Sequence, residues 1–228
     1  MESSGLLRGA ADTHSHILYG VDDGIRTLDQ SLAALDYLGS LGLKELWCTP
    51  HTMEDVPNTT EGLKARFAEL EKAYDGPVEL HLASEYMLDP LFEKHLEDKD
   101  FLYHRMPGSV LVETSMWDAP YNMHEIFYEM LQCRITPVLA HPERYSYMDM
   151  REYETLLGKG VLFQLNLPSV IGVYGDEVRE KALEFLRRGW YAMCGSDCHR
   201  FEAITRQFSA AALRKDTLKA IERIIHSQ

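Results

Sequence analysis

The segment AADTHSHILYGVDDG, residues 10–24, places two histidines two positions apart and follows them with a pair of aspartates. Side chains two apart on a strand point to the same face, so His14 and His16 would converge if this segment is extended. Taken alone, a His-x-His pair is a weak indication of a metal site, because histidines with this spacing are common on surfaces and in cores. The residues that accompany the pair along the chain therefore decide how it is interpreted.

Short apolar runs recur beyond this segment and alternate with longer stretches of helical period. The runs predict strands over 45–48, 78–83, 109–112, 136–140, 161–165 and 190–194, in addition to a first strand leading into His14. Apolar residues spaced three to four apart predict helices over 27–42, 60–73, 123–133, 151–157, 176–188 and 215–225, with Thr27 or Asp29 as a cap for the first helix and Thr60 for the second.

Alternating strands and helices predict a parallel sheet in an α/β fold. Seven or eight such units can close into a barrel, and a barrel places functional side chains at the carboxyl ends of its strands. A chain of 228 residues is long enough for one such barrel, so we expect a single domain over residues 1–228. The first nine residues could be a flexible lead to that domain.

Histidines and acidic residues follow these predicted strands at a regular interval. The steps are 37 residues from His14 to His51, 34 to Glu85, 28 to Glu113, 28 to His141 and 56 to Asp197. Each of the first four steps is about one βα unit, and the last is about two. The strand predicted over 161–165 lies in that last gap and supplies no obvious ligand. A structural constraint alone would not produce so regular a series.

The bulk composition narrows the classes of function. The formal net charge is −13, so nucleic acid and anionic membranes are poor partners. Hydrophobic residues make up 45 % of the chain, as in folded globular proteins. The four cysteines lack a CxxC pair, and no apolar run is long enough for a signal peptide or a membrane span. We therefore expect a cytoplasmic protein.

Carboxylates that directly follow buried strands are costly unless they are paired or bind metal. Several of them gathered at one end of a barrel would repel one another unless cations neutralised their charge. A mixture of imidazole and carboxylate ligands suits Mn, Fe or Zn, in sites of two or three ions. Such sites activate water and bind the oxygens of phosphoryl groups, so the composition of the ligand set favours a metal-dependent hydrolase.

The motifs HSH (14–16), DDG (22–24), TPH (49–51), SEY (84–86), VLVE (110–113), AHPER (140–144) and SDCH (196–199) resemble, in order and spacing, the PHP (polymerase and histidinol phosphatase) superfamily. Within it the chain is similar to the bacterial manganese-dependent protein-tyrosine phosphatases of capsule and exopolysaccharide loci. The resemblance covers about residues 10 to 205. It implies a distorted (β/α)7 barrel with a trinuclear metal site.

The resemblance also implies a ligand set, which is carried over motif by motif. The first metal would be held by His14, His16 and Asp197, and Glu85 would bridge it to a second metal. Glu113 and His141 would complete the second site. Asp23, His51 and His199 would hold the third. All nine positions carry the expected type of residue.

The resemblance further implies that hydroxide held between the metals attacks a phosphomonoester, and that Arg144 stabilises the phosphate. A second catalytic arginine would follow His199, where Arg206 and Arg200 are both candidates, Arg200 also as a substrate-binding residue. The implied partner is a tyrosine-phosphorylated protein, such as a polysaccharide-assembly tyrosine kinase. Two alternatives stay open: a phosphatase of small molecules such as histidinol phosphate, and a metal-binding regulatory partner of the kinase.

Several residues outside the ligand set have competing interpretations. The histidines at 81, 95, 104, 124 and 226 are expected to be surface or packed residues, and Asp22 is expected to shape its loop or support a ligand. Tyr121 and Tyr145 are candidates for substrate contact; with Tyr86, Trp117, Tyr147 and Tyr174 they could equally pack at the rim. The segment from Cys194 to Arg200 has the C-x5-R spacing of cysteine-dependent phosphatases, but Asp197 would place a carboxylate in the phosphate cradle. We therefore do not expect a cysteine mechanism.

Overall fold

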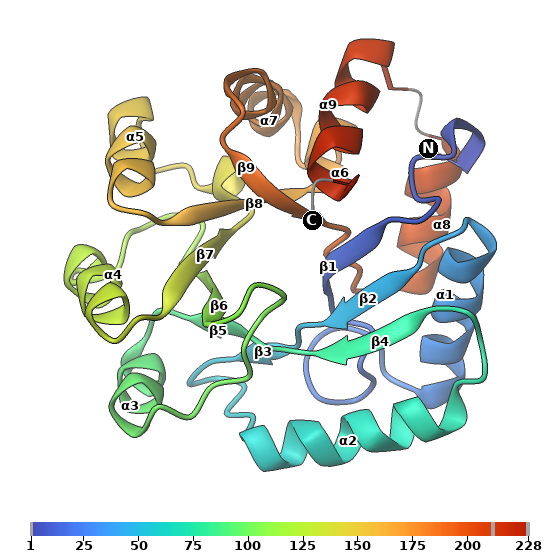
Figure 1. Ribbon diagram of the computed structural model, residues 1–228, viewed down its shortest axis with the longest axis horizontal. Helices are drawn as coiled ribbons and strands as arrows, with labels where there is room; N and C mark the ends of the chain where they lie inside the picture. The colour runs from blue at the N-terminus through green and yellow to red at the C-terminus, as the bar shows by residue number, and fades with distance from the viewer. Residues whose placement is uncertain (1, 211–212, 227–228) are drawn as a thin grey trace.

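A computed structural model describes residues 2–210 and 213–226 of the chain. In that part of the protein, strands surround a central axis and helices lie outside them (Figure 1). The strands are β1 (Ala11–Ser15), β2 (Glu45–Cys48), β3 (His51–Thr52), β4 (Glu79–Leu82), β5 (Glu85–Met87), β6 (Ser109–Glu113), β7 (Thr136–Ala140), β8 (Leu162–Asn166) and β9 (Tyr191–Gly195).

The helices cover the outer faces of these strands, as Figure 1 shows. They are α1 (Leu28–Ser40), α2 (Thr60–Ala73), α3 (Pro90–Asp98), α4 (Met123–Gln132), α5 (Met150–Gly158), α6 (Leu167–Val170), α7 (Asp176–Arg188), α8 (Phe201–Ala210) and α9 (Lys215–His226), with 3-10 turns at Glu2–Ser4 and Pro142–Arg144. None of the helices in the described ranges combines the length and the apolar character that a membrane span needs.

The strands pair in parallel throughout, in two sheets of order β1-β2-β4 and β3-β5-β6-β7-β8-β9. The two sheets are continuous along the chain, because β2 leads into β3 and β4 leads into β5 after breaks of two residues. At the other junction β1 lies beside β9, joined by a parallel bridge between Ser15 and Cys198. The predicted fold class, a distorted parallel barrel of the PHP type, is confirmed.

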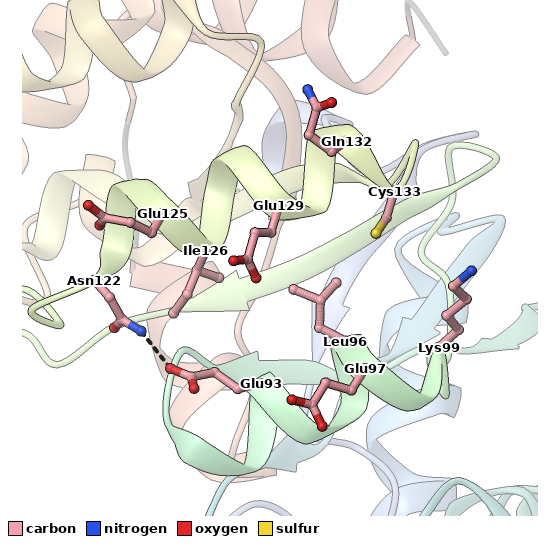
Figure 2. Close-up of a pocket in the computed structure, with 10 residues that line it drawn as sticks. All are labelled: Glu93, Leu96, Glu97, Lys99, Asn122, Glu125, Ile126, Glu129, Gln132 and Cys133. Atoms are coloured by element: carbon pink, nitrogen blue, oxygen red, sulfur yellow. Dashed lines mark hydrogen bonds between the residues drawn. The ribbon is translucent and has the colours of Figure 1, made fainter.

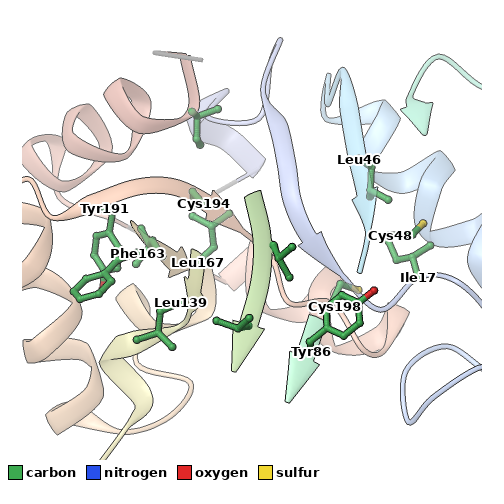
Figure 3. Close-up of a cluster of buried hydrophobic side chains, with 14 of the residues drawn as sticks. Ile17, Leu46, Cys48, Tyr86, Leu139, Phe163, Leu167, Tyr191, Cys194 and Cys198 are labelled. Atoms are coloured by element: carbon green, nitrogen blue, oxygen red, sulfur yellow. The ribbon is translucent and has the colours of Figure 1, made fainter. Parts of the chain in front are cut away.

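The main hydrophobic core lies between the strands and the surrounding helices. Figure 3 shows part of it, with Leu46 and Cys48 of β2, Phe163 of β8 and Tyr191 of β9. A smaller group, consisting of Leu111, Val138, Ala140 and Met193, packs separately from the main core. Strand residues alternate between two faces, so Phe163 and Leu165 of β8 enter the main core while Gln164 and Asn166 face the other side.

Most of the predicted elements are present with boundaries within one or two residues, but some were missed. Strands β3 and β5 are only two and three residues long. Helix α3 begins at Pro90, directly after its N-cap Asp89, and the apolar spacing did not predict it. Helices α6 and α8 were also not predicted. The second predicted cap was wrong by one position: Thr59 is extended and its hydroxyl accepts the N–H of Gly62, so Thr59 caps α2.

The start of the chain corrects the expectation of a flexible lead. Leu6 and Leu7 are buried in the main core, and the N–H of Gly9 donates to the carbonyl of Gly42 at 2.8 Å. Burying two leucines stabilises this segment by roughly 3–5 kcal/mol before conformational entropy is counted. The described part of the lead therefore packs against the barrel.

Candidate metal centre

Each of the nine residues predicted as ligands lies at the carboxyl end of a strand or in the loop that follows it. His14 belongs to β1, His51 begins β3 and Glu85 begins β5. Glu113 ends β6, and His16 and His141 directly follow β1 and β7. Asp23 lies in the loop after β1, and Asp197 and His199 lie in the loop after β9. Because the strands are parallel, these ends meet on one side of the barrel. Segments separated by more than 180 residues therefore face one another.

Glu85 occupies the middle of this group and is completely buried. Its Oε2 lies 3.2 Å from Nε2 of His14, 3.3 Å from Nε2 of His16 and 3.1 Å from Nδ1 of His51. The other oxygen, Oε1, lies 3.0 Å from Nε2 of His141. One carboxylate thus contacts four imidazoles from three strand ends, those of β1, β2/β3 and β7, which is the arrangement of a residue shared between neighbouring metal positions.

Three groups of side chains in the described residues bring potential ligand atoms within 4.8 Å of one another. They are His14, His16 and Glu85; His51, Glu85 and Glu113; and His16, Asp23, His51 and His199. His51 belongs to two of these groups, with Nδ1 2.9 Å from Glu113 and Nε2 3.6 Å from Asp23. The ligand set implied by the resemblance places His51 with Asp23 and His199, so its contact with Glu113 differs from that expectation.

The charges of the buried residues oppose what burial alone would produce. Burial would raise the pKa of Glu85, but the imidazoles of His14 and His51 outweigh it and hold that pKa well below its usual range. Burial would lower the pKa of His14, but Glu85 and Asp197 raise it to about 9. Oε2 of Glu85 has no hydrogen-bond partner among the described residues. Charged carboxylates held in place against imidazoles form a donor set that divalent cations fit.

Asp22, the first aspartate of the DDG motif, supports this set from behind. Its Oδ2 accepts hydrogen bonds from Nδ1 of His16 at 2.8 Å and from the backbone N–H of His51 at 3.0 Å. Its Oδ1 accepts the N–H of Gly24 at 2.9 Å. The bond to Nδ1 leaves Nε2 of His16 facing Glu85, so Asp22 fixes the ring in the orientation that a ligand needs.

Arg144 lines a cavity of about 360 Å³ at the edge of the ligand group, together with Tyr174, Asp197, His199 and Arg200. Its Nη1 donates to Oδ2 of Asp197 at 2.9 Å, and its guanidinium lies 4.4 Å from the centre of the Tyr174 ring. Arg206 does not belong to that lining and is exposed on α8. Arg200, rather than Arg206, therefore lines the same cavity as Arg144.

The aromatic residues considered as substrate contacts differ in how deeply they are buried. Tyr145 is completely buried, where its hydroxyl donates to the carbonyl of Ala140 and accepts the N–H of Thr114, so the expectation that it contacts substrate is wrong. Tyr121 is fully exposed and Trp117 is 73 % exposed. Tyr86 is buried in the core, whereas Tyr174 lines the cavity.

The cysteine motif lies in an environment that disfavours a thiolate. Cys194 and Cys198 are buried and free of disulfides. Burial raises the pKa of both thiols above their ordinary value, and Asp12 raises it further. A nucleophilic cysteine needs the opposite shift, so the geometry agrees with the sequence-based rejection of a cysteine mechanism.

Sequence reasoning did not single out Gln164 and Asn166 of β8, which contact the ligand group. Both are polar residues inside an otherwise apolar, buried strand, and that contrast in the sequence could have identified them.

A separate groove of about 490 Å³ runs between α3 and α4 (Figure 2), and it is lined by four glutamates and none of the predicted site residues.

A parallel α/β barrel whose strand ends gather imidazoles, carboxylates and an arginine beside a cavity defines a class: the chain is a metal-dependent hydrolase. Residues 10–223 match the model of a protein family described as capsular polysaccharide synthesis, CpsB/CapC. The chain belongs to the CpsB/CapC family.

Named relatives and a solved structure agree with this assignment. Tyrosine-protein phosphatase CpsB of Streptococcus pneumoniae is 28 % identical over 205 residues, covering 84 % of each chain. The putative tyrosine-protein phosphatase CapC of Staphylococcus aureus is 24 % identical over 194 residues, covering 82 % of this chain and 76 % of the relative. A structure from work on YwqE of Bacillus subtilis and CpsB of S. pneumoniae, described as metal-dependent tyrosine phosphatases, shares the fold with a TM-score of 0.76 at 21 % identity, covering 94 % of each chain.

Proposed function

We propose that this chain is a manganese-dependent protein-tyrosine phosphatase that acts in the regulation of capsule or exopolysaccharide synthesis. The observation that carries the proposal is the convergence of nine imidazole and carboxylate side chains, with buried Glu85 in their middle, next to a cavity lined by Arg144. The names of the relatives, tyrosine-protein phosphatases of the CpsB and CapC type, supply the substrate class.

The proposed ligands follow the motif order. His14, His16 and Asp197 would hold one ion, Glu85 would bridge to a second held by Glu113 and His141, and Asp23, His51 and His199 would hold a third. Imidazole with carboxylate is a donor set that suits manganese, and iron or zinc would also fit it. Bound there, the ions would activate water and neutralise charge on the phosphoryl oxygens.

The arginines bind and orient the phosphate in this proposal. The planar guanidinium of Arg144 can donate two parallel hydrogen bonds to phosphate oxygens. It lies at the cavity wall with a partly exposed side chain, so it can reach a ligand there. Arg200 lines the same cavity and is the second proposed phosphate contact, in place of Arg206.

Exposed aromatic residues favour a polypeptide over a small phosphomonoester as substrate. Trp117 and Tyr121 are exposed on the loop between β6 and α4, and Tyr174 stacks on Arg144. Such rings supply contact area for a peptide and for the ring of phosphotyrosine. The proposed partner is a tyrosine-phosphorylated protein such as a polysaccharide-assembly kinase.

We also propose that the chain is a single domain in the cytoplasm. One main hydrophobic core that includes residues from Leu6 to Ile225 supports the single domain. Four free cysteines support the reducing environment of the cytoplasm.

Replacement of both first-strand histidines tests the proposal. The wild-type protein should hydrolyse a tyrosine-phosphorylated peptide when Mn²⁺ is added. The His14→Ala/His16→Ala variant should lose this activity and retain less metal by elemental analysis, because two ligands beside Glu85 are gone. His124→Ala, an exposed histidine paired with Glu152, is the matched control and should retain both.

Two results would contradict the proposal. Full activity in the double variant would exclude these histidines as ligands of a catalytic metal. Faster turnover of histidinol phosphate than of the peptide by the wild-type protein would assign the site to small phosphomonoesters.

A further inference from the structure

Strand β8 supplies none of the proposed ligands, yet its two inward-facing amides each bind one of them. Gln164 and Asn166 are two residues apart and completely buried. Oε1 of Gln164 accepts a hydrogen bond from Nδ1 of His14 at 2.9 Å. Nδ2 of Asn166 donates to Oδ2 of Asp197 at 2.8 Å. The first bond leaves Nε2 of His14 facing Glu85, which is the nitrogen that would bind metal.

The two oxygens of Asp197 have different surroundings. Oδ2 accepts hydrogen bonds from both Asn166 and Nη1 of Arg144, the latter at 2.9 Å. Oδ1 faces the imidazoles, 3.6 Å from His14, 3.5 Å from His16 and 3.3 Å from His199. One oxygen is therefore held by donors from the protein, and the other is directed into the ligand group.

The two donors to Oδ2 differ in their freedom to move. The side chain of Arg144 is 23 % exposed and lines the cavity, so it can turn toward a phosphate. Asn166 cannot follow it, because its backbone N–H donates to buried Glu143 at 3.0 Å and its amide also contacts the hydroxyl of Tyr174 at 3.3 Å. If Arg144 were the only donor, binding of phosphate would leave a buried carboxylate oxygen unpaired, which is unfavourable.

We propose that Gln164 and Asn166 are positioning residues for the metal ligands, and that Asn166 holds Asp197 in place while Arg144 binds phosphate. The inference rests on the proposed function, since it takes His14 and Asp197 as ligands. Partners that orient metal ligands in this way typically change metal affinity by about 10- to 100-fold when removed. Strand β8, which supplies no metal ligand, thus orients two of the ligands.

A double-mutant cycle on Asn166 and Arg144 tests the shared support of Asp197. Dissociation constants for Mn²⁺ are measured by equilibrium dialysis for the wild-type protein, Asn166→Ala, Arg144→Ala and the double variant. Each single variant keeps one donor to Oδ2 and should weaken binding by about threefold. The double variant keeps neither donor and should weaken binding by more than the product of the two single effects, toward about 100-fold.

Gln164 is tested in the same assay by replacement and rescue. Gln164→Ala removes the acceptor for Nδ1 of His14 and should weaken Mn²⁺ binding by about tenfold. Gln164→Glu keeps an acceptor at that position and should recover most of the affinity. Asn122→Ala, in the groove between α3 and α4 that holds none of the ligands, should bind Mn²⁺ as the wild type does. If Asn166→Ala does not fold, Asn166→Leu, which is similar in size to asparagine and also lacks a donor, replaces it in the cycle.

The outcomes separate this inference from the proposed function. Losses that simply multiply in the cycle, or a Gln164→Glu variant no better than Gln164→Ala, overturn the inference while a Mn²⁺-binding wild-type protein leaves the function standing. A wild-type protein that does not bind Mn²⁺ overturns both.

Discussion

Burial fixes the protonation state of His104, which lies outside the metal centre. Its Nε2 donates to the backbone carbonyl of Thr13 at 2.6 Å, so this nitrogen carries the proton. Nδ1 is buried and has no hydrogen-bond partner among the described residues. Burial lowers the pKa of His104 to about 4, although the bond to Thr13 opposes the shift. The ring is therefore neutral in the folded protein at pH 7.

This neutral histidine should make the stability of the fold depend on pH. The unfolded chain takes up a proton near pH 6.5, whereas the folded chain does so only near pH 4. The contribution to stability is therefore complete above pH 6.5 and is lost as the pH falls toward 4. At pH 5 the loss should be about 2 kcal/mol. The free energy of unfolding of the wild type and of His104→Gln is measured by urea titration at pH 7 and at pH 5. The decrease between the two pH values should be about 2 kcal/mol smaller for His104→Gln, because the variant has no imidazole to protonate. Equal decreases in the two proteins would contradict a buried neutral ring.

Among the secondary-structure elements, helix α5 depends on one side chain at its start. Oδ1 of Asp149 accepts the backbone N–H groups of both Arg151 and Glu152 at 2.9 Å. These N–H groups have no partner inside the helix, and the carboxylate also interacts favourably with the helix dipole. The corresponding residue of α4, Asn122, makes no such side-chain cap bond. The two helices thus form a matched pair.

Removal of the α5 cap should lower the free energy of unfolding by about 1 kcal/mol. The comparison is between Asp149→Ala and Asn122→Ala in denaturant unfolding of the whole protein. Asn122→Ala should change the stability less, because its side chain caps no backbone group. Similar losses in both variants would show that the bonds of Asp149 do not stabilise α5.

For the molecule as a whole, the contact between β1 and β9 decides whether the strand ends meet. The N–H of Asp197 donates to the carbonyl of His14 at 2.8 Å, and the N–H of His16 donates to the carbonyl of Cys198 at 3.0 Å. Asp12 adds a side-chain bond, since its Oδ1 accepts the N–H of Ser196 at 2.8 Å. These bonds bring the first and last proposed ligands together across the barrel.

A methyl group at position 195 should force these two strands apart. A Cβ there would lie 2.3 Å from Cβ of His14, which is closer than side chains approach. We expect Gly195→Ala to cost about 1–3 kcal/mol in thermal or urea unfolding and to weaken Mn²⁺ binding. Gly158→Ala is the control, because a Cβ there meets nothing within 4 Å. A Gly195→Ala protein with unchanged stability and affinity would show that the strands can separate without disturbing the ligands.

Much of this architecture can be predicted from local sequence. Apolar runs and helical spacing gave the order of strands and helices, because burial imposes periods of two and 3.6 residues on the chain itself. The acidic residues and histidines that directly follow those runs, such as Glu113 and His141, were recognisable for the same reason. Short strands such as β3 were not, since two residues carry no period.

The amino-acid sequence by itself determined the parallel α/β class and the residues that converge at the strand ends, because both depend on positions along one strand or helix. Only the tertiary structure decided that Arg200 rather than Arg206 lines the cavity, that Tyr145 is buried, and that the amides of β8 hold His14 and Asp197. These properties depend on contacts between segments that are far apart in the chain. Their geometry is set by how the whole barrel packs, and no local pattern of residues records it.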